Sequence, residues 1–227
     1  MFLWTAPNPD RDGDMDNSIV VHEYTHGISN RYTGGPATTS CLGNSEQGGE
    51  GWSDYFALTI QNCLALMQNP EAAEKTVTGD WVVNRSRGIR LAPYNDDYPG
   101  KYGDVGAPPY NEEHAVGEIW CAALMKINRD FGTALGNKVK GHRIVWQVVV
   151  DGLKLTPANP SFLDARDAIL HALEDLRNTD ALPHDQFKKL NRAAWHAFAH
   201  FGMGPIASSI GATLEGIVAD TVPPQNI

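Results

Sequence analysis

VVHEYTHGIS, residues 20–29, is the stretch that decides most about the fold and the chemistry of this chain. Its apolar residues and its two histidines have helical spacing, which predicts a helix over residues 18–31. His22 and His26 are four positions apart, so both imidazoles lie on one face of that helix. Glu23 directly follows the first histidine. The two imidazoles can therefore face one metal ion, with a carboxylate beside them.

The pattern His-Glu-x-x-His is typical of zinc peptidases, in which the histidines bind the metal and the glutamate is the general base. In a chain of this composition the pattern arises by chance on the order of one time in a hundred, so it does not define a site alone. Zinc also needs a further nitrogen or oxygen ligand beside an open position for water. A third protein ligand is therefore expected elsewhere in the sequence.

Two glutamates downstream of the histidines, Glu46 and Glu50, are the candidates for that ligand. Glu46 precedes Gln-Gly-Gly, which is poor helix interior. Glu50 opens a run with apolar residues at every fourth position, which predicts a helix over residues 49–67. Asp54 lies on the same face of that helix and can accept the free N–H of a ligand imidazole. The sequence therefore favours Glu50 over Glu46, with Asp54 behind the ligands.

The remaining sequence predicts further helices and almost no strand. Apolar residues recur with helical spacing in residues 114–131, 138–155, 159–176 and 184–201. Residues 69–111 are rich in Gly, Pro, Asp and Tyr, which indicates loops with at most one short helix. Almost nothing alternates with period two over a useful length, so we expect a mainly α fold.

The start of the chain is acidic and turn-rich, with alternating aspartates in residues 10–16. A calcium loop of the EF-hand type needs Gly at its sixth position and Glu at its twelfth, where this chain has Met15 and Val21. We therefore expect a solvated loop, with Asn17 or Ser18 as the N-cap of the next helix. The segment also lacks the basic and apolar regions of a signal peptide. An intracellular protein and a piece of a longer precursor are both compatible with this start.

The composition of the chain argues against several classes of binding partner and site. The formal net charge is −9 and no cluster of Lys and Arg occurs, so neither nucleic acid nor an anionic membrane surface is an expected partner. No apolar run approaches the roughly 20 residues of a membrane-spanning helix. Cys41, Cys63 and Cys121 form no CxxC pair, which excludes a thiolate zinc site. One disulfide and three free buried thiols both stay open.

Longer stretches of the sequence resemble one family. HEYTHGISNRYTGGP, GGEGWSDYFA, DWVVNRSRGIR, EEHAVGEIWCAAL, VVVDGLKLTPANPSFLDARDAIL and AAWHAFAHFGMG occur in order. Together they closely resemble the fungalysin family of zinc metalloendopeptidases, which are thermolysin-like gluzincins. The resemblance covers residues 1–204 and implies a metallopeptidase catalytic domain there, followed by a C-terminal tail over residues 205–227.

The resemblance implies a role for each residue of the first two motifs. His22 and His26 correspond to two zinc ligands, and the glutamate of GEGWSD, which is Glu50, corresponds to the third. The implied cofactor is one Zn²⁺ ion. Glu23 corresponds to the general base, and Asp54 to the acid that contacts a ligand histidine.

The resemblance also implies an oxyanion donor. The histidine of EEHAVGEIW, which is His114, is similar to the histidine that stabilises the tetrahedral intermediate in thermolysin-like enzymes. Pro109 stands where those enzymes carry an aspartate that orients this histidine. Glu112 and Glu113 are the candidate substitutes.

An arginine and a tyrosine are assigned less directly by the resemblance. Arg90, in GIRLAPYND, is similar to the arginine that holds a substrate carbonyl, and Arg85 and Arg87 are nearby alternatives. No residue clearly matches the tyrosine that assists the oxyanion in thermolysin, for which Tyr32 and Tyr110 are candidates.

The family implies a fold and a setting as well. The resemblance to the fungalysins implies a secreted precursor, with a signal peptide, an inhibitory propeptide and a β-rich subdomain ahead of the zinc helix. This sequence starts almost at that helix, so we expect the thermolysin-like C-terminal α-helical subdomain without the N-terminal β subdomain. The expected function is hydrolysis of protein and peptide substrates by an extracellular zinc metalloendopeptidase.

Three alternatives remain open at this point. The chain could be a catalytically impaired zinc-binding fragment or remnant of such an enzyme. A gluzincin aminopeptidase is disfavoured because no G-x-M-E-N motif occurs. A helical interaction domain without metal would require every motif above to be coincidence.

Overall fold

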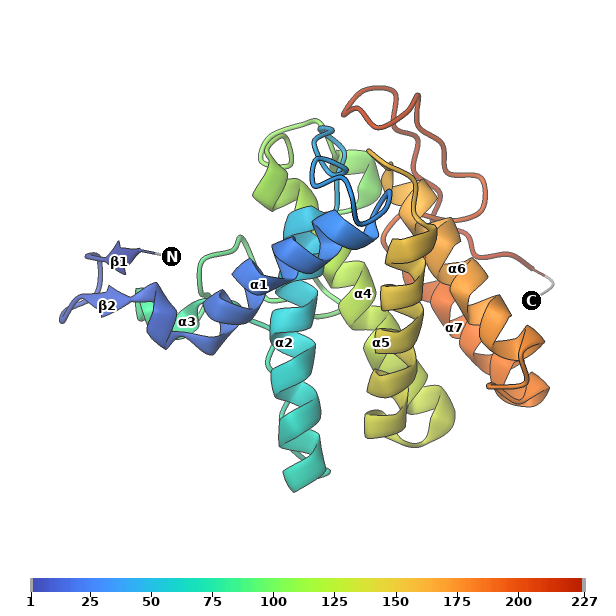
Figure 1. Cartoon of the computed structure of the whole chain (residues 1–227), viewed down its shortest axis with the longest axis horizontal. Helices are drawn as coiled ribbons and strands as arrows, with labels where there is room; N and C mark the ends of the chain where they lie inside the picture. The colour runs from blue at the N-terminus through green and yellow to red at the C-terminus, as the bar shows by residue number, and fades with distance from the viewer. Residues whose placement is uncertain (1, 226–227) are drawn as a thin grey trace.

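The computed structural model describes residues 2–225, and helices dominate this part of the chain (Figure 1). The mainly α prediction is confirmed. The elements are β1 (Leu3–Trp4), β2 (Arg11–Asp12), η1 (Gly13–Met15), α1 (Asn17–Tyr32), α2 (Gly49–Gln68), α3 (Asp80–Val83), η2 (Tyr102–Asp104), α4 (Glu113–Leu135), α5 (Lys138–Leu155), α6 (Phe162–Asn178) and α7 (His184–His200).

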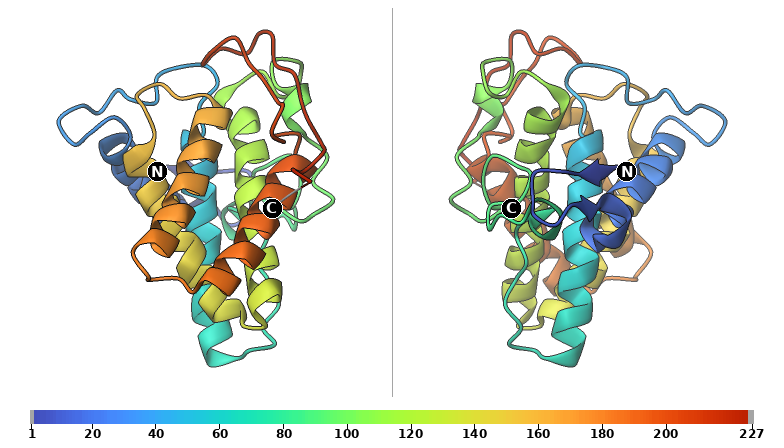
Figure 2. Two further views of the ribbon diagram at one scale, coloured as in Figure 1. Left: turned by 90° about the vertical axis from the view of Figure 1, so that its right-hand side faces the viewer. Right: turned by 90° about the vertical axis from the view of Figure 1, so that its left-hand side faces the viewer.

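Helix α4 is the centre of the bundle. It packs against α2, α5 and α7, while α1 crosses α2 and α6 lies beside α5 (Figures 1 and 2). Every residue from Ala115 to Met125 is buried, which is the pattern of a helix enclosed on all sides rather than an amphipathic surface helix. Trp120 from α4 meets Trp52 from α2 edge to face, with 5.6 Å between ring centroids. Helices α2 and α4 are therefore anchored to one core, whereas Ile19 of α1 packs in a smaller cluster with Val82 and Val83 of α3.

Helix bounds agree closely with the sequence prediction. The helices predicted at 18–31, 49–67 and 138–155 are observed within one residue of those bounds. Residues 69–111, predicted as loops with at most one short helix, contain the four-residue α3 and a single 3₁₀ turn, η2. Periodicity succeeds in α2 and α5 because each buries an apolar face, whereas the buried face of α1 is mostly polar and includes His22.

The start of α1 differs from the prediction. Asp16, rather than Asn17 or Ser18, is the N-cap, and its Oδ1 accepts a hydrogen bond from the Ser18 amide at 2.9 Å. Its Oδ2 accepts from the Val82 amide of α3 at 3.2 Å, so the side chain is buried instead of solvated. One carboxylate thus joins two helices. Local sequence cannot reveal the second of these contacts, which spans more than sixty residues.

The C-terminal residues fold back onto the bundle. Met203 forms a parallel bridge with Asp220, and Ser208 forms an antiparallel bridge with Val218. The Asp220 carboxylate is buried and accepts from the Ile206 amide. Within residues 2–225, no helix is both long enough and apolar enough to cross a bilayer.

A glycine contact sets how closely α2 and α4 approach. A Cβ at Gly51 would lie 2.3 Å from the carbonyl oxygen of Gly117 and 3.0 Å from the amide nitrogen of Cys121. A Cβ at Gly117 would in turn lie 2.7 Å from the Cβ of Glu50. Both contacts involve atoms that cannot rotate away. This close approach fixes the first turn of α2, and therefore Glu50, against α4.

Gly51→Ala tests that contact. We expect a loss of about 3 kcal/mol in the free energy of unfolding, because backbone atoms rather than flexible side chains must move. The matched control is Gly27→Ala in α1, where the new Cβ meets only the end of the Arg31 side chain at 3.5 Å. That variant should be neutral or gain up to about 1 kcal/mol from helix propensity. Urea denaturation measures both, and equal effects of the two substitutions would contradict the packing argument.

Candidate metal centre

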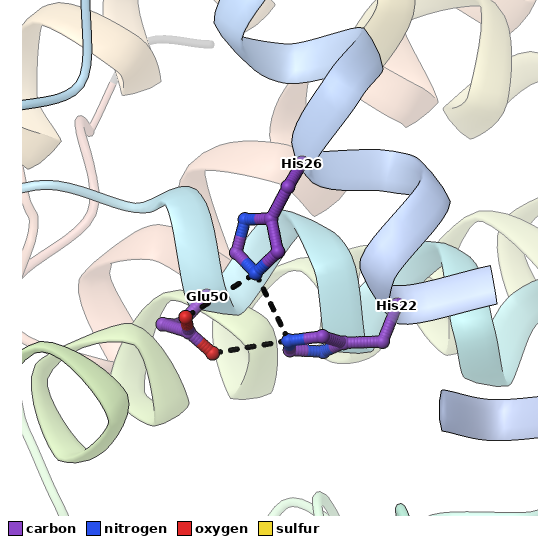
Figure 3. A group of neighbouring side chains, drawn as sticks. All are labelled: His22, His26 and Glu50. Carbon is purple, nitrogen blue, oxygen red and sulfur yellow. Dashed lines mark hydrogen bonds and ion pairs between the residues drawn. The ribbon is translucent and has the colours of Figure 1, made fainter. Parts of the chain in front are cut away.

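Helices α1 and α2 bring three potential metal ligands together at their crossing (Figure 3). The Nε2 atoms of His22 and His26 are 3.1 Å apart, and Glu50 Oε2 lies 3.1 Å from the first of them. Glu50 Oε1 lies 3.3 Å from His26 Nε2. Ligands on a tetrahedral zinc ion at about 2.0–2.1 Å are about 3.3 Å from one another. One ligand atom from each residue lies within 4.8 Å of the other two, so the group is compact enough to surround a single ion. Its donor set of two imidazoles and a carboxylate suits zinc chemically.

The His22 ring is held by a carboxylate behind it. His22 Nδ1 lies 2.8 Å from Asp54 Oδ1, and both side chains are buried. With the Nδ1 proton donated to Asp54, the Nε2 lone pair is free to face the other two ligands. Burial lowers the pKa of His22, but the hydrogen bonds that its ring donates to the Asp54 and Glu50 carboxylates raise it to about 9 on balance. The two carboxylates therefore favour positive charge at the His22 ring.

Glu50 owes its position to the first turn of α2. Gly48, the N-cap, offers no side-chain cap, and a carboxylate in the first turn is favoured by the helix dipole. Burial would raise the pKa of Glu50, but hydrogen bonds with His22 and His26 hold it well below its usual range. Glu50 is therefore a carboxylate, the form a metal needs.

Asp54 is the most buried charge of the centre. Its side chain is 1% exposed, and Arg90 Nε lies 2.6 Å from Oδ2 while Nη2 lies 3.1 Å from Oδ1. Burial alone would raise the pKa of Asp54, but the Arg90 charge and the His22 contact hold it well below its usual range. Arg90 Nη2 also reaches Glu50 Oε2 at 3.2 Å. The arginine thus compensates both acids of α2.

Tyr94 completes this group and was missed by sequence reasoning. Its hydroxyl donates to Asp54 Oδ2 at 2.5 Å, and the residue is fully buried. Tyr94 lies in the loop-rich region after Arg90, where no periodicity marks a residue as facing the site. The one sequence feature that could have indicated Tyr94 is its place four residues after Arg90 in GIRLAPYND.

The two other residues expected to act on substrate, Glu23 and His114, are both exposed. Glu23 is exposed on α1, and the His114 side chain, at the start of α4, is 48% exposed. His114 Nε2 lies 3.7 Å from Glu50 Oε2, and its Nδ1 lies 2.9 Å from Glu112 Oε2. Glu112 is also the N-cap of α4. Of the two candidate orienting acids, Glu112 is therefore the one in contact with His114.

Glu46, the rival for the third ligand, is fully buried elsewhere. Its Oε1 accepts from the Tyr102 hydroxyl at 2.7 Å and from the Phe162 amide, at the start of α6, at 2.9 Å. Its Oε2 has no hydrogen-bond partner among the described residues. The three-residue cluster contains Glu50 and not Glu46, as the helix argument favoured.

The remaining alternatives lie outside the cluster. Arg85 and Arg87 are exposed, whereas Arg90 contacts two of its acids. Tyr32 is 40% exposed with Lys154 over its ring, and Tyr110 is buried. The three cysteines are free and buried, so the open question between one disulfide and three thiols is answered by the thiols.

A His-Glu-x-x-His helix and the next helix thus hold a His-His-Glu cluster, the donor set that the motif of the zinc peptidases predicts. The sequence matches the family model of the fungalysin metallopeptidases (M36) over residues 1–207. The chain belongs to the fungalysin metallopeptidase family.

Curated proteins similar to this chain include several extracellular metalloproteinases. Extracellular metalloproteinase 4 of Arthroderma otae is 38% identical over 224 residues, which cover 90% of this chain and 32% of the relative. Extracellular metalloproteinase MEP of Fusarium vanettenii is 37% identical over 223 residues, with 90% of this chain and 32% of the relative covered. Extracellular metalloproteinase 10 of Coccidioides posadasii is 39% identical over 189 residues, with 76% and 29% covered. The chain spans about a third of the length of these relatives.

The buried Glu46 predicts a pH effect on stability. Burial raises its pKa from an ordinary 4.5 to about 7 in the folded protein. Between these values the unfolded chain releases the proton that the folded chain keeps, so this acid costs stability as pH rises from 4.5 to 7. Glu46→Gln keeps an acceptor for Tyr102 and Phe162 but cannot ionise. We expect its unfolding free energy, relative to the parent, to improve steadily across that window in urea denaturation.

The parent and the variant share every other titrating group, so the difference between their unfolding free energies reports on Glu46. Glu71→Gln, at an exposed glutamate, is the control and should leave the pH profile of stability unchanged. Parallel pH profiles for Glu46→Gln and the parent would contradict the assigned burial cost.

Proposed function

We propose that this chain is the zinc-binding part of a secreted metalloendopeptidase, with His22, His26 and Glu50 as the metal ligands. The observation that carries the proposal is the His-His-Glu cluster on two adjacent helices. Its two Nε2 atoms are 3.1 Å apart, and each lies 3.1–3.3 Å from one oxygen of the Glu50 carboxylate. The size of the cluster, its donor set and the acid behind His22 all agree with a zinc centre. Membership of the fungalysin metallopeptidases supports the same reading.

Zinc held by these ligands supplies a Lewis acid that polarises the scissile carbonyl and lowers the pKa of the attacking water. Glu23 is placed on α1 between the two ligand histidines and has an exposed carboxylate. In the proposed reaction Glu23 accepts the proton of the water and passes it to the leaving amine. Asp54 takes no part in proton transfer and orients His22.

His114 and Arg90 are proposed to contact the substrate. With Nδ1 engaged by Glu112, His114 presents Nε2 on the same side as Glu50, where it can donate to the carbonyl oxygen as charge develops. The hydrogen bonds that Arg90 makes to Asp54 and Glu50 use Nε and Nη2. In the proposed role Nη1 is the group left for a substrate carbonyl.

The setting follows from the relatives. Proteins named extracellular metalloproteinases imply secretion, and a peptidase implies protein or peptide substrates. We assign residues 1–204 to the catalytic domain and residues 205–227 to a C-terminal tail. An inhibitory propeptide in a longer precursor is the proposed natural partner.

A second candidate function is zinc binding without efficient turnover by this chain alone. The observation that favours it is the exposure of Glu23 and His114, because proton transfer and oxyanion stabilisation are most effective in a site shielded from water. Under this candidate the metal binds, but a substrate is not held against it.

Glu23→Gln tests the catalytic proposal. We expect cleavage of an internally quenched peptide library by the purified chain to need zinc and to stop on chelation. The Gln variant should keep one equivalent of zinc by elemental analysis and lose at least about 100-fold in turnover, since it removes the general base. Glu71→Gln is the control and should cleave like the parent.

Two results would count against this assignment. Near-normal cleavage by Glu23→Gln would remove Glu23 as the base. Bound zinc without any cleavage by the parent would favour the second candidate.

A further inference from the structure

The Asp54 carboxylate accepts hydrogen bonds on both oxygens from three residues, one on α1 and two in the loop between α3 and η2. Oδ1 accepts from His22 Nδ1 at 2.8 Å and from Arg90 Nη2 at 3.1 Å. Oδ2 accepts from Arg90 Nε at 2.6 Å and from the Tyr94 hydroxyl at 2.5 Å. A carboxylate with this many partners has one orientation that satisfies all of them. Asp54 can therefore direct His22 only while the donors to Oδ2 stay in place.

Both backbone polar groups of Tyr94 are hydrogen-bonded. Its amide donates to the Thr76 carbonyl at 2.8 Å, and its carbonyl accepts from Arg129 Nη1 of α4 at 3.1 Å. The segment between Arg90 and Tyr94 is also tied to α4, because the Leu91 amide donates to the Glu118 carboxylate at 3.0 Å. The hydroxyl is thus delivered to Asp54 by a backbone that α4 fixes.

Tyr94 differs from Arg90 in what it can do for Asp54. Burial raises the pKa of its hydroxyl well above the usual value, so it remains a neutral donor. Arg90 is shared between Asp54 and Glu50, whereas Asp54 is the hydroxyl's acceptor. A neutral donor fixes the direction of the carboxylate without adding charge to the metal centre.

We propose that Tyr94 is a positioning residue for the zinc centre, acting through Asp54 on the His22 ring. The inference rests on the proposed function, since it takes His22 as a zinc ligand. Without the hydroxyl, Oδ2 keeps Arg90 Nε as its remaining donor, and the orientation of the Asp54 carboxylate is held less tightly. The Nε2 atom of His22 is then aimed less well at the other two ligands.

Tyr98 offers a matched control four residues along the chain. It is equally buried, stacks on Tyr94 with 5.7 Å between ring centroids, and donates its hydroxyl to a buried carboxylate, Glu118 Oε2, at 2.7 Å. That bond touches none of the three ligands. Tyr94→Phe and Tyr98→Phe therefore remove the same group from the same kind of environment. The first removes a donor to Asp54 itself, whereas the second removes a donor to Glu118, whose link to the Tyr94 segment runs through the Leu91 amide.

The test measures zinc affinity of the full chain by competition with a chromophoric chelator, beside urea denaturation in excess chelator. We expect Tyr94→Phe to bind zinc about 10-fold more weakly, the lower end for partners of ligand side chains. Tyr98→Phe should lose comparable stability and keep the parent zinc affinity. The visible spectrum of the Co²⁺-loaded chain should change in Tyr94→Phe and not in Tyr98→Phe.

Three outcomes would overturn the proposal. Equal zinc affinity for Tyr94→Phe and the parent would make Tyr94 a merely structural residue. An equal loss in both tyrosine variants would trace the effect to general destabilisation. Failure of the parent to bind one equivalent of zinc would remove the metal centre itself, and the proposed function with it, which separates the two failures.

A label avoids dependence on the folding of Tyr94→Phe. With 3-fluorotyrosine installed at position 94, the fluorine NMR signal should move when zinc is added, because the hydroxyl contact tightens on Asp54. The same label at position 98 should not move. An unmoved signal at 94 in a zinc-loaded chain would contradict the proposal.

Discussion

Burial of negative charge on α2 is the constraint on which the centre depends. Glu50 and Asp54 lie on one face of that helix, and their side chains are 13% and 1% exposed. Two carboxylates so far from water cost stability unless cations and donors surround them. Arg90 lies against both, and His22 lies between them. The same compensation leaves three potential metal ligands, His22, His26 and Glu50, side by side.

Helix α4 ties this charge cluster to the rest of the bundle. Its first turn carries His114, its next turn places Glu118 under the Leu91 amide, and Arg129 holds the Tyr94 carbonyl. The close contact of Gly51 with Gly117 sets the position of Glu50 relative to α4. One buried helix therefore positions groups that arrive from three separate stretches of sequence.

What could be predicted from the sequence follows from this arrangement. His22, His26, Glu50 and Asp54 sit on regular helices, where a spacing of four residues places side chains on one face. The grouping of the three expected ligands was accordingly visible in the sequence. Tyr94 was not, because it is brought to Asp54 by an irregular loop whose path depends on distant contacts such as that with Arg129.

The N-cap of α1 was misassigned for a similar reason, because the hydrogen bond that buries Asp16 comes from α3 and leaves no local sequence pattern. The buried role of Glu46 is another long-range effect, since its partners are Tyr102 and Phe162.

Anomalous diffraction at the zinc absorption edge, from crystals of the zinc-loaded chain, tests the central claim most directly. The account predicts one strong peak at about 2.0–2.2 Å from His22 Nε2, His26 Nε2 and a Glu50 oxygen. Zinc bound elsewhere, with this cluster empty, would contradict it.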